Sequence, residues 1–308
     1  MRLLSIVFSF RNEEGNLTEL VKRVAKTLEN LKSWDFELIF VDDDSNDDSL
    51  KTLKKLKENF PIKIIRMSRR FGQSACVFAG LEHSSGEAIV YMDSDLQDPP
   101  ELIEKMVKKF EDRFEIVHTK RIKRVGESKL KMLITKIAYK IINAFASVDL
   151  VENVGDFKLI SRKALESLLK IKEIDPYVRG LSVWVGYNQC YVEYEREARH
   201  DGKTQFPLLR SLNPSKEFLR GITTFSAAPL YFSLFVGMLT IIFSIILLFY
   251  GLYLKISGNA IPGTSGIIVA ISLFSGVILF TLGVMGIYVS RIYDQIKGRP
   301  RYIISEII

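Results

Sequence analysis

The first 120 residues alternate between short apolar runs and longer segments in which apolar residues recur with helical spacing. The apolar runs predict β-strands at 3–10, 36–41, 62–67, 87–92 and 114–119. The segments between them predict helices over 16–32, 47–59, 72–84 and 100–111. Strands that alternate with helices indicate an α/β fold, a mostly parallel sheet with helices on both faces. Such sheets bind ligands at the carboxyl ends of their strands.

Two much longer apolar stretches follow in the C-terminal third, where 221–254 and 256–290 contain no charged residue. A helix rises ~1.5 Å per residue, so ~20 apolar residues cross the hydrocarbon layer of a membrane. We therefore predict two transmembrane helices, at about 227–254 and 266–289. Lysines and arginines flank this pair on its outer sides, and positive flanks stay in the cytoplasm. The pattern predicts a multi-pass protein of the inner (cytoplasmic) membrane, with both termini and the N-terminal domain cytoplasmic.

The chain thus divides into four predicted segments. Residues 1–207 form a cytoplasmic α/β domain, 208–225 an amphipathic juxtamembrane segment, 226–290 the two membrane helices, and 291–308 a cytoplasmic tail. Another stretch, 128–145, is both apolar and lysine-rich, which fits either a helix on the membrane surface or a helix that packs on the core. Two membrane helices alone make a small bundle, which is compatible with a homo-oligomer.

Composition and motif tests exclude several classes of site. Only Cys76 and Cys190 are present as cysteines, with three scattered histidines, so there is no zinc-ligand spacing. No GxGxxG or GxSxG motif occurs, and a Walker loop ending at Thr204 fails because Glu197 stands where its first glycine is needed. We expect no nucleic-acid partner. Without a glycine-rich phosphate loop, acidic residues at the strand ends become the better candidates, because they can hold a divalent cation that in turn holds a diphosphate.

The stretch DSDLQDPPE, at 93–101, ends the fourth predicted strand in two closely spaced carboxylates, Asp93 and Asp95. Paired carboxylates repel each other unless a cation lies between them. Asp98 precedes two prolines and the next predicted helix, so we interpret it as a helix cap rather than a ligand.

Several further motifs occur in order along the chain. They are NEE at 12–14, VDDDSNDDS at 41–49, SRRFGQSA at 68–75, GDFKLISR at 155–162 and RxxRxxGxT at 196–204. As a set with DSDLQDPPE, they resemble the family 2 glycosyltransferases of the GT-A fold that load a sugar onto a polyprenyl phosphate. The resemblance covers essentially the whole chain. It extends to dolichyl-phosphate mannose synthases and, through the two C-terminal helices, to bacterial undecaprenyl-phosphate glucosyl- and aminoarabinosyl-transferases.

The resemblance implies a Rossmann-like GT-A domain and assigns roles to individual residues. By this likeness Asp93 and Asp95 bind Mg²⁺ or Mn²⁺, with Gln97 as a third candidate ligand. The implied nucleotide-binding residues are Ser9, Glu13, Asp42, Asp43 and Ser94. Asp44 replaces a glycine usual in the family, so we expect a changed turn there. Asp47 and Asp48 are interpreted as acids at a helix N-terminus.

The resemblance also implies Asp156 as the catalytic base and Arg121, Arg124 and Arg199 as ligands of the acceptor phosphate. Arginine suits phosphate because its planar guanidinium makes two parallel hydrogen bonds. The second pKa of a phosphate monoester is ~6, so the acceptor needs little deprotonation at neutral pH. Asp156 therefore either takes a proton or orients the acceptor or the sugar.

The resemblance thus implies an inverting, metal-dependent transferase. Its donor is a nucleotide sugar, UDP-glucose or another UDP-hexose, with GDP-mannose as the alternative, and its acceptor is undecaprenyl or dolichyl phosphate. Processive polysaccharide synthases are disfavoured because Trp34 and Trp184 do not stand in a QxxRW motif. A non-catalytic membrane scaffold is the other alternative, and it would be indicated by loss of Asp93, Asp95 or Asp156, which are all present.

Overall fold

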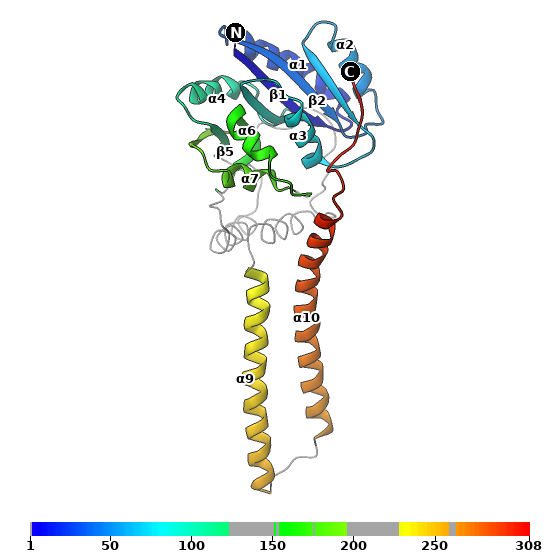
Figure 1. The fold of residues 1–308 in the computed structure, drawn as a ribbon, viewed down its shortest axis with the longest axis vertical. Coiled ribbons are helices and arrows are strands. Elements are labelled where there is room, and N and C mark those ends of the chain that lie inside the picture. The colour runs from blue at the N-terminus through cyan, green and yellow to red at the C-terminus, as the bar shows by residue number, and fades with distance from the viewer. Residues whose placement is uncertain (1, 123–150, 152–153, 175, 196–227, 259–262) are drawn as a thin grey trace.

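A computed structural model of the chain describes residues 2–122, 151, 154–174, 176–195, 228–258 and 263–308. They form a domain of sheet and helices, from which two long helices run side by side (Figure 1). The segments 128–145 and 208–225, together with Arg124 and Arg199, lie outside the described residues.

The domain is built on one eight-stranded sheet. Its strands are β1 (Arg2–Phe10), β2 (Trp34–Asp42), β3 (Ile62–Met67), β4 (Ala88–Asp93), β5 (Ile116–Arg121), β6 (Val154–Ser161), β7 (Gln189–Tyr194) and β8 (Ile304–Ile307), in the order β7-β5-β6-β4-β1-β2-β3-β8. The first five confirm the five strands predicted from the apolar runs. β6, β7 and β8 were not predicted.

Helices cover both faces of this sheet, as the alternating pattern predicts. They are α1 (Glu14–Glu29), α2 (Ser49–Leu56), α3 (Gln73–Glu82), α4 (Leu102–Glu111), α6 (Arg162–Leu169) and α7 (Val178–Trp184). Successive side chains of a strand point to opposite faces, so β1 contributes to two cores. Ile6 and Phe8 pack in the cluster that contains residues of α1, α2 and α4, whereas Val7 packs with residues of α3, α6 and α7.

The sheet is mixed rather than uniformly parallel. β1 pairs in parallel with β2 and β4, as do β2 with β3 and β5 with β7. β6 lies antiparallel between β4 and β5. The N-terminal end of β6 therefore lies beside the carboxyl ends of β1, β2, β4, β5 and β7. This row of strand ends forms the carboxyl edge of the sheet, and it carries the candidate site.

The C-terminal third contains α9 (Ala228–Ile256) and α10 (Thr264–Ile296), which confirm the two predicted long helices. Within them Pro229–Gly251 and Leu273–Ile296 are long and apolar enough to cross a membrane. Many of their large apolar side chains are exposed, as suits helices surrounded by lipid. After α10 the chain returns to the domain, and β8 pairs antiparallel with β3 at the far edge of the sheet.

Candidate active site

The acidic stretch begins on the last residue of β4 and turns away from the sheet. Along it the exposure alternates: Asp93, Asp95 and Gln97 are partly exposed, whereas Ser94 and Leu96 are buried. Leu96 adopts a left-handed φ of 57°, and the Gln97 amide donates a hydrogen bond of 3.2 Å to Asp95 Oδ1. This turn leaves the three side chains predicted to hold a metal accessible, while the residues between them anchor the loop.

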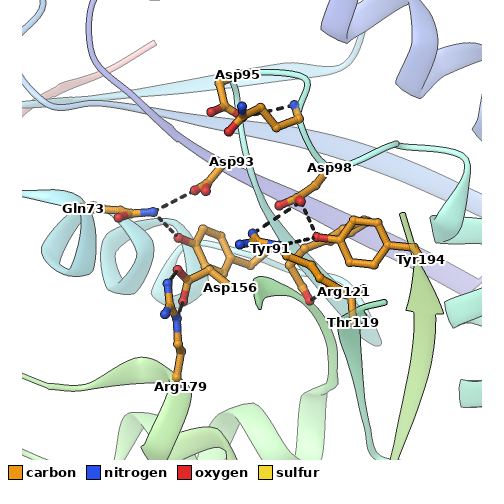
Figure 2. A network of polar contacts seen from close by, with 12 residues as sticks. Gln73, Tyr91, Asp93, Asp95, Asp98, Thr119, Arg121, Asp156, Arg179 and Tyr194 are labelled. Atoms are coloured by element: carbon orange, nitrogen blue, oxygen red, sulfur yellow. Dashed lines mark hydrogen bonds and ion pairs between the residues drawn. The ribbon is translucent and has the colours of Figure 1, made fainter. Parts of the chain in front are cut away.

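A side chain from α3 holds Asp93 in place. Gln73 Nε2 donates to Asp93 Oδ1 at 2.7 Å and to the hydroxyl of Tyr91 at 3.1 Å (Figure 2). Gln73 is the first residue of α3 and follows Gly72, whose φ of 96° is a conformation that glycine readily adopts. The SRRFGQSA motif thus places an amide against the first acid of the DSD sequence.

Several carboxylates surround Asp93. Burial, together with the carboxylates of Asp156, Asp98 and Asp95, raises the pKa of Asp93 to about 7, and the Arg179 guanidinium offsets only part of this effect. A divalent cation beside Asp93 would relieve the repulsion, because it favours the ionised carboxylates.

The donor atoms at this edge suit a hard cation. Asp93, Asp95 and Gln97 offer carboxylate and amide oxygens, which are the ligands that Mg²⁺ and Mn²⁺ prefer. Within the described part of the chain, no three carboxylate, imidazole or thiolate groups gather closely enough to hold a metal alone. The residues therefore fit an ion that takes its remaining ligands from water and a bound diphosphate, and these metal ligands stay a prediction.

The predicted nucleotide-binding acid Asp43 joins two strand-end loops. Its Oδ1 accepts hydrogen bonds from the amides of Phe71 at 2.7 Å and Gly72 at 3.1 Å. Asp43 thereby fixes the loop between β3 and α3 against the end of β2.

The neighbouring turn is built around Asp42 and Asp44. The Asp42 carboxylate accepts the Ser45 amide at 2.8 Å, and Arg66 Nε lies 3.9 Å from its other oxygen. Burial raises the pKa of Asp42, although the Ser45 hydrogen bonds and Arg66 counteract it. Asp44 has a φ of 60°. Aspartate tolerates this left-handed conformation, which glycine also favours, and the changed turn expected from the replacement of glycine stays a prediction.

The other residues predicted to bind nucleotide lie at the same edge and are buried. Ser9 pairs in register with Asp93, and the Ser94 hydroxyl donates to the Ser9 carbonyl at 3.3 Å. Glu13 precedes α1, and its carboxylate accepts from Asn16 Nδ2 at 2.6 Å. Their contact with a nucleotide stays a prediction.

Asp47 and Asp48 lie at helix starts, as interpreted from the sequence. Asp47 accepts the amide of Ser49, the first residue of α2, at 3.1 Å, and the amide of Glu14, the first residue of α1, at 3.3 Å. Asp48 is the exposed N-cap residue of α2. Asp47 therefore serves two helix N-termini at once.

Asp156, the predicted catalytic base, lies on β6 and is bound by an arginine of α7. Arg179 Nε donates to Asp156 Oδ1 at 2.8 Å, and Arg179 Nη2 pairs with Oδ2 (Figure 2). Burial on its own would raise the pKa of Asp156, but Arg179, with Lys158 and Arg121, lowers it to about 2. A carboxylate held in this way is a poor proton acceptor, which favours an orienting role for Asp156.

The interpretation of Asp98 as a helix cap is wrong. Asp98 is 1% exposed, and Oδ1 accepts a hydrogen bond from the Tyr194 hydroxyl and lies 3.5 Å from Arg121 Nη2. Glu101 is instead the N-cap residue of α4, and it makes no side-chain cap hydrogen bond. The burial of Asp98 decides the matter, because a buried carboxylate needs donors and a cation, which β5 and β7 supply.

Arg121, predicted to bind the acceptor phosphate, ends β5 beside the acids. Its Cα pairs with that of Tyr194 in the parallel β5–β7 register, and its Nε donates to the Tyr194 hydroxyl at 2.9 Å. The side chain is 20% exposed, so it remains accessible from the site. Its contact with a phosphate stays a prediction.

Three residues of this edge had no role predicted from the sequence: Gln73, Arg179 and Tyr194. Gln73 lies within the SRRFGQSA motif, so the motif itself signalled its importance. Arg179 and Tyr194 lie in α7 and β7, neither of which was predicted, and no local pattern connected them to the acids.

Comparison with known proteins finds a family model, full-length relatives and a solved structure to which this chain is similar. The model of the family described as "Glycosyl transferase family 2" matches residues 5–169. The uncharacterized glycosyltransferase YkcC of Bacillus subtilis is 40% identical over 98% of this chain and 93% of its own length. The SfII prophage-derived bactoprenol glucosyl transferase of Shigella flexneri is 33% identical over 98% of this chain and 97% of its own. Glucosyl-3-phosphoglycerate synthase from Mycobacterium tuberculosis aligns over 71% of this chain and 76% of its own, with a TM-score of 0.48 and 21% identity. By its family model and its full-length relatives, the chain belongs to glycosyl transferase family 2 and is a glycosyltransferase.

Proposed function

We propose that this glycosyltransferase transfers a hexose from a nucleotide sugar, with UDP-glucose as the first choice, to a polyprenyl phosphate. One observation carries the proposal: a bactoprenol glucosyl transferase matches 98% of this chain and therefore extends through both apolar helices. Similarity of the catalytic domain alone would support many acceptors. Similarity that includes the helices supports an acceptor that is a membrane lipid.

The helices suit that acceptor physically. A polyprenyl chain partitions into the bilayer, and the described helices α9 and α10 carry apolar stretches of membrane-spanning length. The positive residues outside both stretches favour a topology in which the catalytic domain and both termini are cytoplasmic.

The proposed chemistry is a single displacement with inversion at the anomeric carbon. An oxygen of the acceptor phosphate forms the new bond to this carbon as the bond to the nucleotide diphosphate breaks, and both electrons of the broken bond leave with the diphosphate. The acceptor phosphate has a second pKa of ~6, so no proton must be removed at neutral pH. This fits Asp156, whose pKa of about 2 makes it a poor base.

Asp93, Asp95 and Gln97 would hold Mg²⁺ or Mn²⁺, which as a Lewis acid would stabilise the departing diphosphate. Ser9, Glu13, Asp42, Asp43 and Ser94 would form the nucleotide side of the site. Support for this arrangement comes from their common position at the carboxyl ends of β1, β2 and β4.

The test is transfer from radiolabelled UDP-glucose, other UDP-sugars and GDP-mannose to undecaprenyl phosphate in detergent, with Mg²⁺, Mn²⁺ or EDTA. We expect label to enter the lipid from a UDP-hexose and EDTA to abolish transfer. Asp93→Asn and Asp95→Asn should each lower the rate at least roughly a hundredfold, because each removes a charged metal ligand. Asp35→Asn is the matched control, since Asp35 is exposed at the opposite end of β2.

Transfer that persists in EDTA, or in both site variants, would refute the metal assignment but not the proposed acceptor. Transfer from GDP-mannose alone would show that the donor is GDP-mannose rather than a UDP-hexose. Folded protein that binds UDP but gives no labelled lipid from any donor would refute the polyprenyl phosphate acceptor.

A further inference from the structure

The short helix α7 is fixed to the sheet by buried and partly buried polar side chains of three strands. From β6, Lys158 Nζ donates to the Ser182 hydroxyl at 3.0 Å. From β7, Gln189 Nε2 lies within hydrogen-bond distance of the carbonyls of Ser182, at 3.3 Å, and Val183, at 3.2 Å. From β5, His118 Nε2 pairs with Gln189 Oε1 at 2.9 Å. Because buried polar groups are costly unless paired, this network defines one position for α7.

α7 carries Arg179 in its first turn, and this position brings the guanidinium to the active edge. Nε and Nη2 both engage Asp156 in a side-on pair (Figure 2). The Arg179 side chain is nevertheless 39% exposed, whereas that of Asp156 is 17% exposed. The acid thus orients the arginine, whose side chain remains the more exposed of the two.

Arg121 repeats this arrangement from β5. Its Nε donates to the Tyr194 hydroxyl at 2.9 Å and its Nη2 lies 3.5 Å from buried Asp98. The guanidinium also lies over the backbone next to Asp156, since a Cβ on Gly155 would be 3.3 Å from Arg121 Nη2. Two arginines, each paired with an acid, therefore flank the start of β6.

We propose that Arg179, together with Arg121, binds the phosphate of the lipid acceptor, and that Asp156 is a positioning residue that holds Arg179 in place. This inference rests on the proposed function. Planar guanidinium groups bind phosphate oxygens through paired hydrogen bonds. Arg179 thereby becomes a phosphate-binding residue to which no sequence motif had assigned a role.

The position of the pair separates it from the donor. Figure 2 shows Asp95 and the Asp156–Arg179 pair on opposite sides of Asp93. The donor diphosphate would be neutralised by the metal ion at Asp93 and Asp95. The reaction also requires a second anion, the acceptor phosphate, which attacks the sugar. If it enters on the Arg179 side, it meets the two arginines.

The experiment measures steady-state transfer to undecaprenyl phosphate by the full-length protein in detergent, with the UDP-sugar identified for the wild type. Arg179→Gln should raise the acceptor KM roughly ten- to a hundredfold, the effect of losing a charge-assisted hydrogen bond. The donor KM, and UDP binding without acceptor, should change less than about twofold, because the donor site is intact. Arg179→Lys should recover part of the loss, since it keeps the charge without the planar fork. Lys163→Gln is the control, because Lys163 is an exposed cation on α6.

The role of Asp156 is tested by the acceptor KM and by the pH dependence of kcat/KM. Asp156→Asn should raise the acceptor KM as Arg179→Gln does, and the double variant should be no worse than about the stronger single variant. The acidic limb of kcat/KM should stay near pH ~6 in Asp156→Asn, because it reports the second ionisation of the acceptor phosphate.

Three results would overturn the inference while the proposed function stands. They are an unchanged acceptor KM in Arg179→Gln, a loss that falls on the donor KM and UDP binding instead, and disappearance of the acidic limb in Asp156→Asn. A fall in kcat that only tracks thermal stability, with both KM values unchanged, would likewise make Arg179 purely structural. Absence of transfer by the wild type from every donor would instead refute the proposed function, and this inference with it.

Discussion

The Asp43 carboxylate is bound to the backbone amide of Gly72, with both of its oxygens 3.1 Å from that nitrogen. The Phe71 amide adds a third contact at 2.7 Å. Asp43, the residue after β2, thus positions the loop that follows β3, and this loop leads into Gln73, the partner of Asp93. One side chain thus links the residues predicted to bind nucleotide to those predicted to bind a metal ion.

We expect Asp43→Ala to lower the free energy of unfolding by about 2–4 kcal/mol, because two partly buried amides lose a charged acceptor. UDP affinity should fall as well, since the loop that carries Gln73 is released. Thermal unfolding and UDP titration of the same detergent-solubilised sample measure both effects. Asp48→Ala is the control, because Asp48 is an exposed acid nearby at the start of α2 and makes no side-chain cap hydrogen bond. Wild-type stability in Asp43→Ala would contradict the structural role of this acid.

The buried contact between Tyr194 and Asp98 leads to a second prediction. Tyr194→Phe removes a donor from Asp98 and an acceptor from Arg121 Nε without changing the ring. We expect a loss of about 1–3 kcal/mol in unfolding free energy, since a buried carboxylate loses a hydrogen bond. Tyr191→Phe, three residues earlier on β7 and 38% exposed, should behave like the wild type. Equal melting temperatures for the two variants would refute this view of Asp98.

The sequence predicted the parts of the fold in which local pattern and burial agree. The first five strands are short apolar runs, and they occur where the periodicity indicates. β6 was not predicted, because Asp156 and Lys158 interrupt its apolar pattern, although Lys158 is fully buried. The short β8 has Ser305 and Glu306 between its two isoleucines, and only its pairing with β3 makes it a strand.

The same limit applies to the site. Acids at strand ends are visible in sequence, and the topology brings Asp43, Asp93 and Asp156 to one edge as expected. The partners of those acids are not visible, because they are distant in the chain. Asp98 looked like a helix cap from its neighbouring prolines, yet its partner Tyr194 is 96 residues away. Sequence therefore indicated which charges matter, and tertiary contacts determine what each of them does.

His118 should make the stability of the protein sensitive to acid. Burial lowers the pKa of His118 to about 4, with a smaller contribution from the charge of Lys158, whereas the unfolded histidine titrates near 6.5. Between these values the unfolded chain binds a proton that the folded chain does not. Stability is therefore complete above pH ~6.5 and is lost as the pH falls towards 4.

The measurement is thermal or urea unfolding of the wild type and His118→Phe between pH 7.5 and 4.5. We expect the wild type to lose ~2–3 kcal/mol more than the variant over this range, because a shift of one pKa unit corresponds to ~1.4 kcal/mol. Parallel pH profiles for the two proteins would contradict the assignment of this loss to His118.

The end of α10 and the segment that follows it are hydrogen-bonded to the catalytic domain before the chain enters β8. The Gln295 side chain donates to the Lys172 carbonyl at 2.6 Å and accepts the Ile174 amide at 3.1 Å. Arg301 Nε donates to the Glu173 carbonyl at 2.7 Å. These contacts connect a helix of membrane-spanning length directly to the loop that follows α6.

A protein that ends at Arg301 should lose β8 and leave the edge of β3 uncovered. Ile64 exchanges backbone hydrogen bonds of 2.9 and 2.8 Å with Ile308, and these would be lost. We expect a fall of about 2–4 kcal/mol in unfolding free energy and a tendency to associate through the open edge, because an unpaired strand edge is a template for pairing. Thermal unfolding and size-exclusion chromatography in detergent measure the two effects, with full-length Arg299→Ala, a change at an exposed residue, as the control. A truncated protein that melts and elutes like the control would show that β8 contributes nothing to the stability of the sheet.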